Sequence, residues 1–393
     1  MHRIDTAERR RRIGARHALA GPRPKTGLAS LADDLAGIHA TDPASVYMEL
    51  RARTSELGHA DVERALYDDR TLVKVLGMRR TMFVVSPRFA AVIHVATASD
   101  IAARERRRLY QMLEGAGITS DAARWVAAAE SDTLDALHEL GEATAVELTK
   151  RVPELRAQIS FGEGKAWAGT FGVSTRLLFL LSAEGRIVRG RPKGSWLSSM
   201  YRWVPMDRWI DGGLEPWPAE RAQAELVRRW LGAFGPGTVR DVQWWTGWTV
   251  ARTKAALRAV GAVEVELEDG AAGWVLPDDV ESTHDPGPWI ALLPSLDSTV
   301  MGWKERDWYL DGLYRELFDN AGNAGPTVWV DGRVVGLWAQ RANLEVGYRL
   351  LRDVGAEQRR ALDEEAARLT TWLGMDRVFP RFPNRLFQEL ADS

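Results

Sequence analysis

The sequence has no cysteine among its 393 residues. This absence excludes disulfides, thiolate zinc sites and cysteine nucleophiles together, and it fits a reducing cytosol. A zinc site would have to use the 7 histidines and the carboxylates, and no HExxH pattern occurs. We therefore expect no metal and no other cofactor.

Long hydrophobic runs are also missing. The first twenty residues lack the apolar segment of a signal peptide, and no apolar stretch reaches the roughly eighteen residues of a membrane span. The chain is therefore expected to be cytoplasmic, with no membrane partner.

An excess of positive charge is absent too. Lys+Arg number 52 and Asp+Glu number 54, which leaves a formal net charge of -2. Binding to nucleic acid would therefore depend on local basic clusters. Such clusters do occur, and arginine dominates them, because only 7 of the 52 basic residues are lysine. They lie at residues 9–12, 79–80, 104–108 and 186–193.

One pattern of elements occurs three times, and its third copy is the clearest. Residues 219–234 have apolar side chains at helical spacing and stop at a Gly-Pro-Gly sequence. Thr238 and Thr249 then begin two short helices, each ended by a glycine. A two-stranded hairpin follows around Asp269-Gly270. Helix, helix-turn-helix and hairpin in this order predict a winged helix.

The other two copies are more degenerate. The second runs from Thr133 to about Asp207 and ends in a wing that mixes basic and aromatic residues, and the first runs from Arg10 to Pro87. After them, the sequence becomes rich in strand-forming residues from about position 285.

These patterns predict an α+β fold with three tandem winged-helix units, followed by a small β-rich, barrel-like domain with a C-terminal helix. That helix is expected from about Glu357 to Leu373. The predicted boundaries are 1–125, 126–215, 216–285 and 286–393.

Four segments carry a resemblance to a known family. They are an LxGΦxxxDP pattern at Leu35 to Pro43, MRRTMFVVSP at Met78 to Pro87, LLPSLDS at Leu292 to Ser298 and GRVVGLW at Gly332 to Trp338. In this order, with tandem winged helices, they make nearly the whole chain similar to the AlkZ-like (YcaQ-like) winged-helix DNA glycosylases.

The resemblance also points to a candidate active site. In that family a Gln-Φ-Gln or Gln-Φ-Asp motif before the Asp-Pro pair faces the flipped nucleotide, whereas this sequence has His39-Ala40-Thr41. Many members also have a histidine in the wing where this chain has Phe83. The resemblance therefore assigns His39, Thr41 and the adjacent Asp42 as catalytic candidates, with altered residue types.

A histidine and a threonine suit the chemistry that the resemblance implies. Guanine alkylated at N7 is positively charged and leaves readily, so catalysis must mainly stabilise the oxocarbenium-like sugar and direct one water to it. His39 would accept a proton from that water, Thr41 would hold it in line, and Asp42 would stabilise the sugar cation. The structural alternatives are that His39 ends an amphipathic helix and that Asp42, before Pro43, caps the next one.

Basic and amide side chains near the wings and one hairpin are the candidate DNA contacts. The hairpin tip lies between two predicted strands near position 341 and would enter a groove. The candidates are Arg79, Arg80, Arg186, Arg189, Arg191, Lys193, Gln340, Arg341 and Asn343.

Together these features predict a monomeric, monofunctional DNA glycosylase acting on double-stranded DNA that carries alkylated guanine. The expected substrates are bulky N7 adducts of a DNA-alkylating natural product, in repair or self-resistance. Water is the expected nucleophile, because the lysine closest in sequence to the motif is Lys25. The alternative is a non-catalytic winged-helix DNA-binding protein, such as a regulator or a damage-recognition protein.

Overall fold

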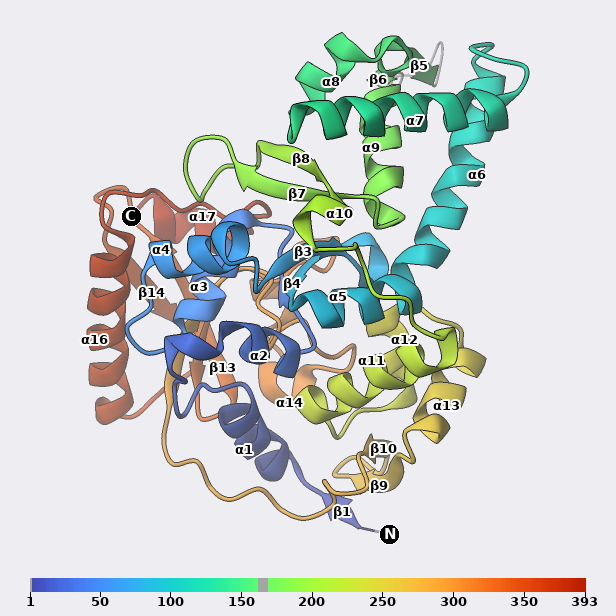
Figure 1. The fold of residues 1–393 in the computed structure, drawn as a ribbon. Coiled ribbons are helices and arrows are strands. Elements are labelled where there is room, and N and C mark those ends of the chain that lie inside the picture. Colours follow the sequence, from blue (N-terminus) through green and yellow to red (C-terminus); the bar gives the residue numbers. More distant parts are fainter. Residues whose placement is uncertain (1, 162–168) are drawn as a thin grey trace.

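The computed structural model describes residues 2–161 and 169–393. Its elements form four consecutive groups, and Figure 1 shows the second group projecting from the rest on the long helix α6 (Ser99–Gly115). One hydrophobic cluster includes residues from all four groups. The groups therefore pack as one body.

The first group surrounds a three-stranded sheet in which β4 lies between β2 and β3. The predicted cap is confirmed here: the Asp42 carboxylate accepts a hydrogen bond from the Ala44 amide at 3.3 Å, and Pro43 begins helix α3. The elements are α1 (Thr6–Arg16), α2 (Leu28–Asp34), β2 (Ile38–His39), α3 (Pro43–Arg51), α4 (His59–Glu63), β3 (Val73–Leu76), β4 (Met82–Val85) and α5 (Pro87–Ile93).

The second group follows α6 and contains the predicted second wing, strands β7 and β8. A capping box begins α8, where the Glu147 carboxylate accepts from the Thr144 amide at 2.7 Å. The pair β5 and β6 has no counterpart in the sequence prediction. The elements are α7 (Ala122–Leu140), α8 (Ala145–Arg151), β5 (Gln158–Phe161), β6 (Gly169–Gly172), α9 (Val173–Ala183), β7 (Ile187–Pro192), β8 (Tyr201–Pro205) and α10 (Met206–Trp209).

The third group has the predicted order of three helices and a hairpin. Thr238 caps its second helix by accepting from the Asp241 amide at 3.1 Å, and Gly247 ends that helix in the left-handed conformation with φ of 76°. A strand from the N-terminus, β1 (Arg3–Ile4), joins the hairpin in parallel to β9. The other elements are α11 (Ala219–Phe234), α12 (Val239–Thr246), α13 (Val250–Ala259), β9 (Val263–Leu267) and β10 (Ala272–Val275).

The fourth group is an open sheet of four strands in the order β11-β12-β13-β14, so the barrel-like closure predicted from sequence is wrong for the described residues. Four strands are too few to close, and α16 packs instead against both edge strands, β11 and β14. The elements are β11 (Ile290–Leu293), α14 (Asp307–Leu310), α15 (Tyr314–Leu317), β12 (Thr327–Val330), β13 (Arg333–Gln340), β14 (Val346–Leu350), α16 (Ala356–Leu373) and α17 (Arg385–Ala391).

A buried ion pair fastens the first group to the fourth. The Arg53 guanidinium donates to both carboxylate oxygens of Asp297, at 2.9 and 2.7 Å, and both side chains are fully buried. Glu49 lies beside this pair, and burial together with Asp297 raises the pKa of its carboxyl well above the usual value. Helix α3 is therefore fixed at its end as well as at its capped start.

Two kinds of feature are absent from residues 2–161 and 169–393. None of their helices has the length and apolar character needed to cross a bilayer. These residues also contain no group of three or more potential metal ligands from histidine, aspartate and glutamate.

Candidate functional site

The motif strand β2 begins after a glycine with a backbone that other residues rarely adopt. Gly37 has φ of +113°, and a Cβ there would lie 3.1 Å from Phe83 Cδ1. His39 then pairs with Phe83 in an antiparallel register, and the Ala40 amide donates to the Met82 carbonyl at 2.8 Å. His39 therefore lies on a strand, and the alternative in which it ends a helix is wrong.

The His39 imidazole is enclosed, with 4% of the residue exposed. Its ring meets the Phe83 ring edge-on at 5.4 Å between centroids, and its Nδ1 is buried without a hydrogen-bond partner in the described part of the chain. Burial and the nearby Arg79 lower the pKa of His39 to about 3. The imidazole is therefore neutral at pH 7, but it is a weaker base than an exposed histidine.

The strand register places His39 and Lys74 on opposite faces of the sheet. His39, Phe83 and Val75 form one cross-strand row, whereas Lys74 lies in the next row beside Val84. Adjacent residues of a strand point to opposite faces, so the two rows face opposite ways.

Thr41 and Asp42 meet the C-terminal segment just beyond the end of β2. The Arg381 guanidinium donates to the Thr41 carbonyl at 3.3 Å, and the Arg381 amide donates to the Asp42 carboxylate at 3.3 Å. Burial raises the pKa of Asp42. The Thr41 hydroxyl is buried and has no hydrogen-bond partner among the described residues, which leaves it able to bind a ligand or a water.

A cavity of about 220 Å³ opens beside Thr41, between the first group, the β7–β8 wing and the C-terminal segment. Three cationic residues line it, and the described residues of its wall include no aspartate or glutamate. Hydroxyl groups from β8, from the loop between the two wing strands and from the first group complete the wall. The cations are Lys74, Arg189 and Arg381, and the hydroxyl residues are Thr41, Ser198, Ser199 and Tyr201.

Lys74, like Arg381, is a charged lining residue that sequence reasoning missed. Its Nζ donates to the Tyr67 hydroxyl at 2.6 Å, and burial and the neighbouring Arg189 lower its pKa to about 8. The available signal was a single lysine inside the apolar segment LVKVLG. Its position next to Thr41 depends on the fold, because the two residues are far apart in the sequence.

The two arginines of the first wing contact other side chains of the protein. The Arg79 guanidinium stacks on Trp244 at 3.9 Å from the ring centroid, and Arg80 forms an ion pair with Glu105 at 3.3 Å. Burial and a neighbouring arginine lower the pKa of Arg79 to about 10. Both residues lie in the turn between β3 and β4, which packs near α12. The wall of the 220 Å³ cavity includes neither of them.

The basic residues of the second wing are divided among different roles. Arg189 lines the cavity, with its guanidinium over the Tyr201 ring at 4.4 Å, and Lys193 is exposed. Arg186 pairs with Glu130 at 3.2 Å, and Arg191 pairs with two carboxylates of the first group at 3.1 and 2.7 Å. Arg189 is thus the predicted DNA contact that the fold brings next to Thr41.

The predicted hairpin tip joins β13 to β14. Gln340 is 1% exposed, and its amide donates to the Leu344 and Asp376 carbonyls at 3.1 and 3.0 Å. Asn343 is exposed and donates to the Glu345 carboxylate at 2.9 Å. Gln340 therefore supports the hairpin from inside, whereas Asn343 lies at its surface.

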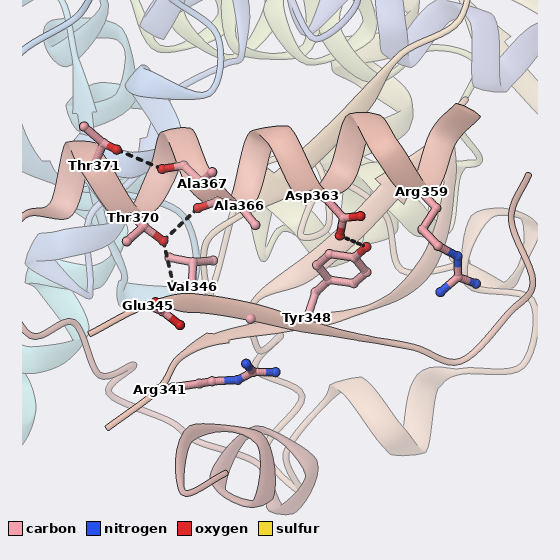
Figure 2. A pocket seen from close by; sticks show the side chains of 11 residues that line it. Arg341, Glu345, Val346, Tyr348, Arg359, Asp363, Ala366, Ala367, Thr370 and Thr371 are labelled. Carbon is pink, nitrogen blue, oxygen red and sulfur yellow. Dashed lines mark hydrogen bonds between the residues drawn. The ribbon is translucent and has the colours of Figure 1, made fainter. Parts of the chain in front are cut away.

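Arg341 lines a second, wider hollow of about 640 Å³ between the hairpin and α16. Figure 2 shows Arg341 and Arg359 on either side of Tyr348, whose hydroxyl donates to the Asp363 carboxylate at 2.5 Å. Acidic residues lie among the basic ones here, so this hollow lacks the uniform charge of the cavity beside Thr41.

Two further basic clusters differ in exposure. Arg12 is buried and pairs with Glu8 and Asp279 at 2.7 and 3.1 Å. On α6, Arg104, Arg107 and Arg108 are exposed, whereas Arg106 pairs with two carboxylates. The α6 cluster is therefore open to an external partner, and the cluster around Arg12 is used for packing.

The comparison with protein families identifies the class. A family model described as DNA glycosylase AlkZ-like matches residues 32–372, so this chain belongs to the AlkZ-like DNA glycosylase family. The matched region contains the motif strand, Lys74 and the second wing, and it ends before Arg381.

Two matches, one by sequence and one by structure, come from Streptomyces sahachiroi. The first is an interstrand DNA cross-link repair glycosylase with 27% identity over 176 residues, which span 43% of this chain and 47% of that protein. The match thus spans about half of the curated relative. The second is the solved DNA glycosylase AlkZ, with a TM-score of 0.73 and 19% identity over 96% of this chain and 98% of that one. This likeness establishes a shared mixed α+β fold.

Proposed function

We propose that this chain is a monofunctional DNA glycosylase that hydrolyses the N-glycosidic bond of N7-alkylated guanine in double-stranded DNA. The observation that carries the proposal is the cationic cavity beside Thr41, which suits the sugar-phosphate backbone next to a reacting nucleotide. Family membership supports the reaction class. The cross-link repair relative supports a bulky alkylated substrate, such as an adduct of a DNA-alkylating natural product.

Each motif residue has a role in this proposal. The Thr41 hydroxyl, which has no hydrogen-bond partner among the described residues, orients the attacking water. A neutral His39 adds no positive charge near an oxocarbenium-like sugar. In this proposal its buried Nδ1 accepts a hydrogen bond from the attacking water. The Asp42 carboxylate, when ionised, stabilises the developing cation.

The proposed DNA interface combines the three groups, which we infer to be tandem winged helices, with exposed basic side chains. Arg189 of the second wing lies in the cavity wall beside Thr41, Lys193 is exposed on the same wing, and Asn343 and Arg341 lie on the β13–β14 hairpin. The protein is proposed to act as a monomer in the cytoplasm.

The test is release of the modified base from a duplex that carries one N7-alkylguanine. Free base is measured by mass spectrometry, and the abasic site is measured by strand cleavage in alkali. We expect His39→Ala and Thr41→Ala each to slow release by about 10²-fold, as for the loss of one acid-base or orienting group. His138→Ala is the matched control, because His138 is partly exposed and pairs with Asp207 at 3.2 Å.

The enclosed His39 ring favours one alternative, a non-catalytic DNA-binding protein. The ring packs on Phe83, where many family members have a histidine, and His39 is not part of the cavity wall. In that case the wild-type protein would bind the alkylated duplex without releasing base. Release at the wild-type rate by both motif variants would instead remove His39 and Thr41 from the mechanism.

A further inference from the structure

The cavity beside Thr41 holds positive charge that its own wall does not balance. Lys74 Nζ is satisfied by a neutral phenol, the Tyr67 hydroxyl at 2.6 Å, and not by a carboxylate. Arg189 stacks on Tyr201, and its Nε is buried without a hydrogen-bond partner in the part of the chain that the structure describes. The Arg381 guanidinium donates to the Thr41 carbonyl, which is also neutral, and its nearest described carboxylate interaction is with Asp42, which lies outside the cavity wall.

Three such cations in one partly enclosed space repel one another. Burial and the neighbouring Arg189 lower the pKa of Lys74 to about 8, and burial lowers the pKa of Arg189 as well. An anion in the cavity would remove this repulsion and replace the lost hydration of the cations. The cavity is therefore incomplete without an anionic ligand.

The donors around the cavity fit the oxygens of a phosphate group. Guanidinium groups bind phosphate through two parallel hydrogen bonds, and lysine binds it as a point charge. The hydroxyls of Ser198, Ser199 and Tyr201 add neutral donors. The wall comes from three parts of the chain, so its geometry is fixed by tertiary packing and not by one mobile loop.

We propose that this cavity binds one phosphate group of the DNA backbone next to the nucleotide that faces Thr41, with Lys74, Arg189 and Arg381 as its ligands. The proposal rests on the proposed function for the identity of the polymer. The anion site itself rests on the cavity.

The first experiment measures duplex binding by Lys74→Met and Arg189→Met, with Lys25→Met as the control for loss of an exposed lysine that pairs with Asp61 at 3.4 Å. We expect each cavity variant to bind about tenfold more weakly, as for loss of a charge-assisted hydrogen bond, and the control to be unchanged. A set of duplexes then carries a neutral methylphosphonate at one position each, on both sides of the lesion. At one methylphosphonate position we expect the wild-type protein to bind about tenfold more weakly than it binds the unmodified duplex. On that duplex the cavity variants should bind as tightly as the wild-type protein, because the phosphate charge that they would contact is already absent.

The second experiment uses inorganic phosphate at constant ionic strength and measures the melting temperature. We expect phosphate to stabilise the wild-type protein and not Lys74→Met. Without phosphate, Lys74→Met should melt at or above the wild-type temperature, because it removes a buried cation that lacks a charged partner. A purely structural lysine would give the opposite result, a lower melting temperature in every buffer.

The outcomes separate this proposal from the proposed function. Unchanged affinity in both cavity variants, or equal weakening on every methylphosphonate duplex, would overturn the phosphate site even if base release is normal. A protein that shows the single-position effect but releases no base keeps the phosphate site and loses the glycosylase assignment. Stabilisation by inorganic phosphate without any position effect on DNA would assign the cavity to a free anion and overturn the backbone proposal.

Discussion

Gly37 explains, at the scale of one residue, why the motif LxGΦxxxDP contains its glycine. Its φ of +113° is a conformation that residues with a Cβ rarely adopt, and a Cβ would also approach Phe83 at 3.1 Å and Val85 at 3.2 Å. The residue stands immediately before the strand that carries His39. Its freedom therefore sets the position of the catalytic candidates.

We expect Gly37→Ala to destabilise the protein by about 2 kcal/mol, because the backbone strain and the contact with Phe83 add. Gly21→Ala is the control, since no heavy atom lies within 4 Å of a Cβ built there. Urea denaturation followed by tryptophan fluorescence measures both. Equal midpoints for the two variants would show that the Gly37 conformation is not required.

Lys74 permits a direct check of the monofunctional assignment. The expectation of simple hydrolysis used the distance in sequence to Lys25, yet the fold places Lys74 in the same cavity as Thr41. A bound phosphate would raise the Lys74 pKa again, and an ammonium group cannot attack an aldehyde. We therefore expect borohydride to trap no covalent complex with a duplex that contains an abasic site.

A bifunctional glycosylase treated in parallel shows that the trapping reaction works. A trapped band that disappears in Lys74→Arg would contradict the expectation and assign imine chemistry to this lysine.

Helix α3 shows how a single element is held at both ends. Asp42 caps its start, and the Arg53–Asp297 pair fixes its end to the fourth group. We expect Arg53→Met to lower the free energy of unfolding by about 3–5 kcal/mol, because Asp297 would remain buried without its partner. Arg151→Met should cost less than about 1 kcal/mol, since the Arg151–Glu139 pair is more than half exposed. Chemical denaturation of both variants tests this contrast, and similar losses would contradict it.

Elements with local signals were predictable from sequence. The caps Thr238 and Gly247 and the hairpin turn around Asp269-Gly270, where Gly270 has a positive φ, each depend on a few neighbouring residues. Strand β2 was not predictable in the same way, because its two residues are held by β4, more than forty positions later.

The candidate site could be predicted only in part for the same reason. The family motif located Thr41 and Asp42, and the basic wing located Arg189. Lys74 and Arg381 reach the cavity through packing between segments that sequence alone does not bring together. The open sheet of the fourth group could not be predicted for the same reason, because it depends on the packing of α16 against both edge strands.

Buried histidines make the stability of the whole molecule depend on pH. His17 is fully buried, its Nε2 donates to the Ala233 carbonyl at 3.0 Å, and burial lowers its pKa to about 3. The unfolded chain binds a proton at about pH 6.5, so the stability from neutral His17 is complete above that pH and is lost as the pH falls towards 3. At pH 5 the loss is about 2 kcal/mol for one such group.

The pKa of Glu49 is raised, so its contribution to stability grows as the pH falls, opposite to that of His17. The test therefore compares the pH dependence of the wild-type protein with that of a His17 variant. His17→Gln keeps a donor and an acceptor without a titrating group. We expect the wild-type protein to lose about 2 kcal/mol more than this variant between pH 7.5 and pH 5 in urea denaturation. An equal loss in both proteins would exclude His17 as the source.

The contact of Arg381 with Thr41 and Asp42 has a consequence during synthesis on the ribosome. The early walls of the cavity, at Thr41 and Lys74, emerge long before the segment that contains Arg381. Groups of a large protein fold in order as they emerge, so a nascent chain acquires a complete cavity only after the segment that contains Arg381 has emerged and docked. A chain truncated after α16 would lack the guanidinium neighbour of Thr41 together with the buried side chains of Phe387 and Leu390.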